Sequence, residues 1–188
     1  MSDHDPTPAR IFRDYATALY ASLADDPFYR ALEDSVADRS RSKQAMLAYY
    51  DYSILEAAQY GHVVQPEPDR FGISVWAVPL ASATAAHKAA AKKTALGAVM
   101  GEASLQLYTD ISASMSRTTG PLVSDRDWYL SILGVLPEYQ GKGLGKDLIR
   151  PILDKADSAG AATYLETFTP RNMSFYRRLG YQAAGSFD

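Results

Sequence analysis

The stretch that decides the fold is Gly134-Val135-Leu136-Pro137-Glu138-Tyr139-Gln140-Gly141-Lys142-Gly143-Leu144-Gly145-Lys146. The apolar run before it, from Asp127 to Val135, predicts a strand, and the amphipathic run from Gly145 to Ser158 predicts a helix. Glycines at alternate positions of the connecting loop allow a tight turn and a close approach of the backbone to a ligand. The helix that follows presents unpaired N–H groups with positive dipole character. The sequence therefore predicts a loop that binds a phosphate or pyrophosphate.

Length and composition indicate one globular domain. The chain has 188 residues, of which 47% are hydrophobic and 22% charged, enough for one substantial core. It contains no apolar run of the roughly 20 residues that a membrane-spanning helix needs. The segment Met1-Ser2-Asp3-His4-Asp5 is polar and acidic, unlike a signal peptide. We therefore expect a cytoplasmic protein without a membrane partner.

The same composition excludes several classes of site. The chain has no cysteine, which rules out disulfides, thiolate metal sites and an acyl group carried on a protein sulfur. A net charge of −3 argues against a nucleic-acid partner. The three histidines, His4, His62 and His87, lie far apart in the sequence, so we expect no metal site.

Periodicity places helices mainly in the first half of the chain and most of the sheet in the second. Helices are expected at 11–24, 40–60, 145–158 and 172–179, and strands at 62–65, 71–78, 127–135, 162–168 and 181–184. The alanine-rich segment 81–117 predicts one broken helix or two helices, with the break at Gly97 or Gly101.

Glycine spacing separates the known phosphate-binding fingerprints. The P-loop pattern requires Ser or Thr after its lysine, but Asp147 follows Lys146, which excludes it. A dinucleotide fingerprint requires a glycine where Lys146 stands, although Glu166 lies near the offset of a ribose-binding acid. A dinucleotide-binding loop therefore stays an open alternative. The residues match Gln-x-x-Gly-x-Gly, at Gln140, Gly143 and Gly145.

On this motif the chain resembles the GCN5-related N-acetyltransferase (GNAT) superfamily. The resemblance continues downstream through Tyr164-Leu165-Glu166-Thr167, Pro170-Arg171-Asn172 and Phe175-Tyr176-Arg177-Arg178-Leu179-Gly180-Tyr181. The run from Trp128 to Tyr181 is most similar to the puromycin N-acetyltransferase branch. The resemblance implies an α/β (α+β) fold with a mixed, mostly antiparallel central sheet flanked by helices and a helical insertion between the third and fourth strands. It also implies a single domain over 1–188, with the acceptor side in 1–126 and the acetyl-coenzyme A half in 127–188.

The resemblance implies that acetyl-coenzyme A is the cosubstrate, and it indicates which residues bind it. Backbone N–H groups of the glycine loop suit the pyrophosphate, and Lys142 and Lys146 add positive charge or are simply solvated. Two strands that splay apart would expose the peptide groups of residues 133–135 to the pantetheine arm. The expected cofactor-binding residues are Leu133, Gly134, Val135, Gln140, Gly141, Lys142, Gly143, Leu144, Gly145, Lys146, Asn172 and Tyr176.

The implied reaction is direct attack by a primary amine of a small molecule on the thioester, in a ternary complex. Tyr176 stands where the superfamily places the acid that protonates the leaving thiolate. An alkyl amine has a pKa near 10.4, so it needs a base, and Glu166 is the main candidate unless it pairs with an arginine. Asp127, Tyr129 and His62 are lesser candidates, and backbone N–H groups near Val135 suit the oxyanion.

The acceptor side is less defined by the sequence. The N-terminal helices, the strand 72–78 and the insertion 81–117 are expected to form the acceptor pocket. Its wall is proposed to include the aromatic residues Tyr49, Tyr50, Tyr52, Tyr60 and Trp76, unless they belong to the core. A Rossmann-type nucleotide-binding module and a non-catalytic acyl-coenzyme A sensor are the alternative functions.

Two departures from the family pattern concern the sheet. The first strand of the family is barely visible at Arg10-Ile11-Phe12, and no further strand follows 181–184. Either the chain is shortened there or a neighbouring molecule completes the sheet, and an open sheet edge would favour a homodimer.

Overall fold

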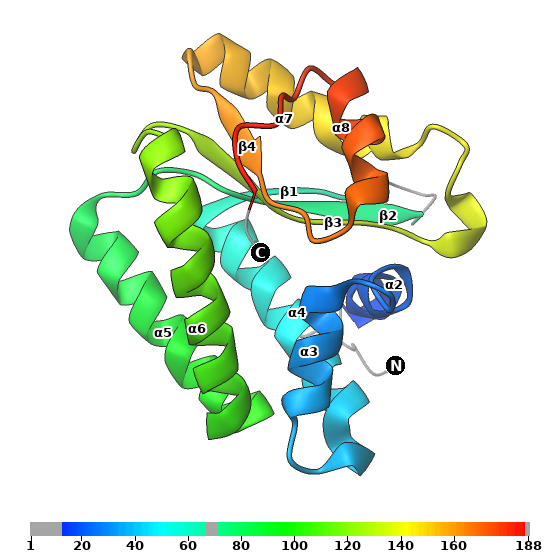
Figure 1. Cartoon of the computed structure of the whole chain (residues 1–188), viewed down its shortest axis with the longest axis vertical. Coiled ribbons are helices and arrows are strands. Elements are labelled where there is room, and N and C mark those ends of the chain that lie inside the picture. The colour runs from blue at the N-terminus through cyan, green and yellow to red at the C-terminus, as the bar shows by residue number, and fades with distance from the viewer. Residues whose placement is uncertain (1–12, 67–70, 187–188) are drawn as a thin grey trace, which may run out of the picture.

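The computed structural model describes residues 13–66 and 71–186 (Figure 1). Its centre is a four-stranded sheet in the order β1-β2-β3-β4, formed by β1 (Gly61–Val64), β2 (Gly72–Ala77), β3 (Trp128–Val135) and β4 (Thr163–Leu165). The first three strands are antiparallel neighbours, and β4 runs parallel to β3. The mixed, mostly antiparallel sheet is therefore confirmed, and it contradicts the Rossmann alternative, which requires a mostly parallel sheet.

Helices cover both faces of this sheet. Their bounds are α2 (Arg13–Ser22), α3 (Pro27–Ser35), α4 (Ser42–Tyr60), α5 (Ser82–Met100), α6 (Glu102–Thr119), α7 (Gly145–Ala159) and α8 (Met173–Arg178). Figure 1 shows α7 and α8 on one face of the sheet, and α2, α3, α4 and the α5–α6 hairpin on the other. The sheet thus separates two layers of helices.

Each face of β2 contributes to a different part of the core because side chains alternate along a strand. Ile73 and Val75 pack with the helices of the lower layer in Figure 1, in a cluster that includes Leu19. Trp76 points the other way and packs with Ile149 and Ile152 of α7. Trp76 is fully buried, so this part of the predicted aromatic wall belongs to the core.

The helical insertion lies between β2 and β3 of the described sheet. It is numbered between the third and fourth strands only when the family's first strand, expected at residues 10–12, is counted, and those residues lie outside the described ranges. The break falls at Gly101, whose φ is 87°, while Gly97 lies within α5. A positive φ is costly for residues with a Cβ, which explains glycine at the turn.

Helix α3 was not predicted. The run Asp25-Asp26-Pro27 ends the preceding helical segment, and it also begins the next helix. Asp26 is the N-cap of α3, where its side chain accepts a hydrogen bond from the backbone N–H of Phe28 at 3.0 Å, and Pro27 takes the first helical position. Aspartate and proline are favoured at these positions.

The predicted strand at 181–184 is wrong. Residues 181–186 form neither helix nor strand, and β4 itself spans 163–165 rather than 162–168. The short β4 offers little edge for pairing, so Tyr181 contacts it through a side chain: Thr163 Oγ1 donates to the Tyr181 hydroxyl at 3.1 Å. No helix within the described residues is long and apolar enough to cross a membrane.

Candidate active site

Strands β3 and β4 diverge after a short parallel ladder. They pair only from Trp128 to Leu130 on β3, whereas β3 continues to Val135 alongside β2. Within the described residues, the β4-facing edge of β3 therefore has no strand partner over 131–135. Such an edge can pair with an extended ligand through main-chain hydrogen bonds.

The glycine loop after β3 has the backbone geometry of an anion site. Gly141 and Gly143 have φ values of 75° and 79°, and a Cβ added at either residue would meet open space. Among the described residues, no hydrogen-bond acceptor is found for the backbone N–H groups of residues 141–145. These five groups lead into the N-terminus of α7, which begins at Gly145 and where the helix dipole favours negative charge.

A cleft of about 430 Å³ opens beside this loop, and we call it the donor cleft. Ten of the twelve residues expected to bind the cofactor line it: Leu133, Gly134, Val135, Gln140, Gly141, Gly143, Leu144, Gly145, Asn172 and Tyr176. Lys142 and Lys146 do not line it; the ammonium of Lys142 lies 5.2 Å from the ring centre of Tyr139. Arg171 and Arg178 line the cleft and were not predicted. The free N–H groups, the open strand edge and the two arginines fit the pyrophosphate and amides of coenzyme A.

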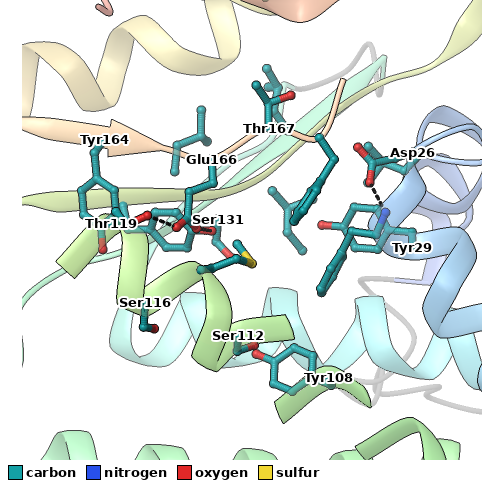
Figure 2. Close-up of a pocket in the computed structure, with 18 of the residues that line it drawn as sticks. Asp26, Tyr29, Tyr108, Ser112, Ser116, Thr119, Ser131, Tyr164, Glu166 and Thr167 are labelled. Carbon is teal, nitrogen blue, oxygen red and sulfur yellow. Dashed lines mark hydrogen bonds between the residues drawn. The ribbon is translucent and has the colours of Figure 1, made fainter. Parts of the chain in front are cut away.

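A second cavity of about 360 Å³, the acceptor cavity, lies on the other side of the strand opening. One face of α6 supplies a row of lining residues at helical spacing, namely Tyr108, Ser112, Met115, Ser116 and Thr119. Figure 2 shows Ser112 and Ser116 of α6 across the cavity from Tyr164 of β4 and from Glu166, which follows β4, with Thr119 close to Glu166. The helical insertion therefore forms one wall of the cavity.

Tyr176 on α8 lines both cavities. Burial, then the neighbouring Tyr181 and Asp26, raise the pKa of its phenol to about 12. The phenol consequently stays protonated at neutral pH and can donate a hydrogen bond. Its ring packs edge-on against Phe175 at 5.2 Å and Tyr181 at 5.9 Å, which holds the side chain in place.

Glu166 lines the acceptor cavity and is held by two hydroxyls. Thr119 Oγ1 donates to one carboxylate oxygen, and the Tyr129 hydroxyl donates to the other at 3.0 Å (Figure 2). Among the ion pairs of the described residues none joins Glu166 to an arginine. Burial and Glu166 together raise the pKa of the Tyr129 hydroxyl well above its ordinary value, so Tyr129 remains a donor.

Asp26 is a second carboxylate of this site and is not among the residues predicted from the sequence. It lines both cavities, and Figure 2 shows it on the side of the acceptor cavity opposite Glu166. Burial raises the pKa of its carboxyl, although hydrogen bonds from Phe28, Tyr29 and Thr169 oppose the shift. The N-cap pattern Asp-Pro was the sequence signal for this residue, but it indicates a helix start and not a catalytic role.

The remaining residues predicted for the site have different positions in the structure. Asp127 accepts hydrogen bonds from the backbone and hydroxyl of Ser124, which closes a turn. His62 lies on β1 against the ring of Trp128 at 5.1 Å. Neither lines the donor cleft or the acceptor cavity, whereas Tyr129 and Tyr49 line the acceptor cavity. Tyr50 is buried in the core.

Diverging strands, a glycine loop with free N–H groups and two adjoining cavities are the features expected of an acyl-transfer enzyme of the GNAT fold. Residues 10–181 match the acetyltransferase (GNAT) family. The chain therefore belongs to this family and is an N-acetyltransferase.

Relatives and solved structures agree with this assignment. The chain is 24% identical over 184 residues to an uncharacterised N-acetyltransferase of Schizosaccharomyces pombe, covering 92% of this chain and 71% of the relative. A Corynebacterium glutamicum crystal structure, described as histone acetyltransferase HPA2 and related acetyltransferase, superposes with a TM-score of 0.59 at 18% identity. Arylalkylamine N-acetyltransferase 2 of Aedes aegypti gives a TM-score of 0.57 at 15% identity. Both comparisons cover 90% of this chain and 78% of the other, and they show the fold.

Proposed function

We propose that this protein transfers an acetyl group from acetyl-coenzyme A to a primary amine of a small molecule, by direct attack in a ternary complex. The observation that carries the proposal is that the donor cleft and the acceptor cavity share five lining residues, Leu23, Asp26, Leu133, Asn172 and Tyr176. Two ligands bound on either side would meet at these residues. Effective concentration at such a junction accounts for a large part of the rate of a two-substrate reaction.

The donor side is assigned to residues of β3, the loop and α7. Backbone N–H groups of residues 141–145 bind the pyrophosphate, with Arg171 and Arg178 adding positive charge. The free edge of β3 over 133–135 binds the pantetheine amides. When bound, acetyl-coenzyme A supplies the thioester acyl group. A backbone N–H near Val135 stabilises the negative charge that develops on the acyl oxygen.

Tyr176 and a carboxylate handle the protons. Tyr176 donates to the leaving sulfur, and the attacking ammonium must first lose a proton to a base. Glu166 is the base proposed from the sequence; its two hydroxyl partners, Thr119 and Tyr129, fix its carboxylate in the cavity. Asp26 is an alternative candidate for the base, because it lines both cavities and its charge acts on Tyr176.

The acceptor is an amine that fits the acceptor cavity. A small amine is supported by the fold neighbour from Aedes aegypti, which is named for arylalkylamines. The resemblance to the puromycin branch adds an aminonucleoside to the amines worth testing. A cytoplasmic location and a homodimer belong to the same proposal; β4 has no outer strand partner among the described residues, but its three residues offer only a short edge to a second copy. Sedimentation tests the dimer, and cell fractionation tests the location.

The test measures thiol release from acetyl-coenzyme A across arylalkylamines, diamines, amino acids and aminonucleosides, together with calorimetric titration of acetyl-coenzyme A. Saturable binding and turnover with at least one amine support the proposal. Binding without turnover on any amine would favour the acyl-coenzyme A sensor. Absence of binding to folded protein would reject the donor site itself.

A further inference from the structure

A third cavity of about 370 Å³ lies between α4, α5 and the end of β2, and we call it the distal cavity. It adjoins the acceptor cavity, because Lys92, Tyr108, Tyr129 and Ser131 line both. The roles proposed above use none of its charged residues. It is therefore a candidate subsite for the part of the acceptor that does not react.

The distal cavity contains a small charge cluster with an excess of positive charge. Glu56 on α4 is only 8% exposed, and one of its oxygens, Oε2, lies 3.3 Å from the ammonium groups of both Lys88 and Lys92 on α5. Two ammonium groups thus share a single carboxylate. Lys92 also lies over the ring of Tyr108, 5.6 Å from its centre. Burial opposes the charge on Lys92, but Tyr108 and Glu56 outweigh it and raise its pKa, so Lys92 stays protonated.

The second oxygen of Glu56 points to an absent partner. Oε1 is buried and has no hydrogen-bond partner among the described residues. Tyr52, one turn earlier on α4, has its pKa raised by burial, by the charge of Glu56 and by a hydrogen bond to the Glu56 side chain, and Oε1 still has no partner of its own within the described part of the chain. A buried carboxylate oxygen without a partner is costly, so a donor group of a ligand or water is expected there.

Charge changes sign between the two ends of the joined cavities. The reacting end carries the carboxylates of Asp26 and Glu166, which attract an ammonium group. Lys92 is the one lysine or arginine among the described residues that line the acceptor cavity, and Lys88 lies beyond it in the distal cavity. An acceptor with an amine at one end and an anion at the other matches both ends. A diamine would place a second cation against the two lysines.

We propose that Lys92 and Lys88 bind an anionic group of the acceptor, so that the enzyme prefers zwitterionic amino acids to diamines of equal length. Glu56 holds the two ammonium groups in place and accepts a hydrogen bond from the acceptor or from its hydration water. This inference depends on the proposed function. Carboxylates and phosphonates share the required charge, and the experiment includes both.

The first experiment compares kcat/KM for four acceptors with the same linear chain and a terminal carboxylate, phosphonate, methyl or ammonium group, over several chain lengths. The anionic acceptors should exceed the methyl acceptor by about tenfold or more, the ordinary worth of a hydrogen bond to a charged group, mainly through KM. The diamine should be the poorest. Equal values for all four, or a preference for the diamine, would overturn the inference while leaving acetyl transfer itself established. Failure to acetylate any amine would instead overturn the proposed function on which the inference rests.

The second experiment uses the lysines, with a matched control on the same helix. Lys92→Gln and Lys88→Gln should raise KM for the anionic acceptor much more than KM for the methyl acceptor. Lys93→Gln removes the same charge from an exposed position of α5 and should change neither value. If the cluster only fastened α5 to α4, the first two variants would lower the melting temperature and affect all acceptors alike. The wild-type series remains decisive if a variant fails to fold.

Discussion

Asp26 and Tyr176 come from opposite ends of the chain and meet at the junction of the donor cleft and the acceptor cavity. Asp26 caps α3 and Tyr176 lies on α8, yet both line both cavities. After burial and Tyr181, the charge of Asp26 is a cause of the raised pKa of Tyr176. A group that accepts a proton and a group that donates one therefore lie together at the point where the two substrates would meet.

The two carboxylates can be separated by substitution. If Glu166 is the base, Glu166→Gln should lower kcat/KM by about 10²- to 10⁴-fold and remove the acidic limb of the pH–rate profile, while Asp26→Asn keeps that limb. The reverse pattern would assign the base to Asp26. Asparagine can still cap a helix, so Asp26→Asn should keep α3 intact. If the pH–rate profiles of both variants retain the acidic limb, neither Glu166 nor Asp26 is the general base.

Tyr176→Phe removes the proposed proton donor and little else. We expect kcat to fall about 10²- to 10⁴-fold, with KM for acetyl-coenzyme A nearly unchanged, because the hydroxyl acts on the leaving sulfur. Tyr181→Phe is the matched control, since its ring packs on Tyr176 while its hydroxyl accepts a hydrogen bond from Thr163. Steady-state kinetics with a good amine measure both. A kcat for Tyr176→Phe within a few-fold of the control would exclude the acid role.

The backbone of the glycine loop can be tested by a pair of alanine substitutions. Gly143 in the loop has φ of 79°, and Gly160 at the end of α7 has φ of 63°, so an alanine costs about 1 kcal/mol at either position. Gly143→Ala alone alters the anion cradle and should weaken acetyl-coenzyme A binding about tenfold, the equivalent of 1.4 kcal/mol. Gly160 does not line the donor cleft, so Gly160→Ala should leave the dissociation constant unchanged. Calorimetry that found equal constants for both variants would place the pyrophosphate elsewhere.

The part of the site that sequence could predict is the part built from neighbouring residues. The strand, the glycine loop and α7 follow one another along the chain, so their pattern indicated both the fold and eight residues of the donor cleft, while Asn172 and Tyr176 came from the resemblance further along the chain. The prediction of a strand at 181–184 was wrong because that strand depends on a distant segment of the chain. Its formation depends on a partner edge, and three residues of β4 provide little of one.

The acceptor side depends on contacts between distant segments. Thr119 and Glu166 are 47 positions apart, and Lys92 and Glu56 are 36 apart. No local periodicity predicts such pairs, which arise because the α5–α6 hairpin packs against α4 and beside the opening of the sheet. Asp26 shows the same limit, since Asp-Pro is a common helix start and only the fold brings it to Tyr176.

Asp26 should also leave a signature in the pH dependence of stability. Burial raises its pKa above the ordinary value of 3.8, so the native state holds this proton more tightly than the unfolded state does. Its contribution to stability is complete below the unfolded pKa and is lost as pH rises through the folded pKa. Asp26→Asn removes this dependence. The melting temperature of the variant minus that of the wild type should therefore increase as pH rises through this range and stay constant above it. A constant difference across that range would contradict the raised pKa.

The position of α7, and with it the anion site, depends on a buried hydrogen-bond chain. Trp76 Nε1 donates to Ser74 Oγ at 2.9 Å, and Ser74 Oγ donates to the Leu148 carbonyl at 2.6 Å, joining β2 to α7. Ser74→Ala leaves the buried indole N–H of Trp76 without its partner and removes the bond to the Leu148 carbonyl, so it should cost about 2 to 4 kcal/mol in the free energy of unfolding.

The matched control for Ser74→Ala is Ser158→Ala, which removes an exposed hydroxyl bonded within α7 and should change stability by less than about 0.5 kcal/mol. Urea unfolding measures both variants. Because the glycine loop leads directly into α7, Ser74→Ala should also weaken acetyl-coenzyme A binding, although Ser74 is fully buried and does not line the donor cleft. If Ser74→Ala were no less stable than Ser158→Ala, the packing of α7 on the sheet would not depend on the hydrogen bonds that join Trp76, Ser74 and Leu148. The loop would then be held in place by the apolar contacts of α7, which include those of Trp76 with Ile149 and Ile152.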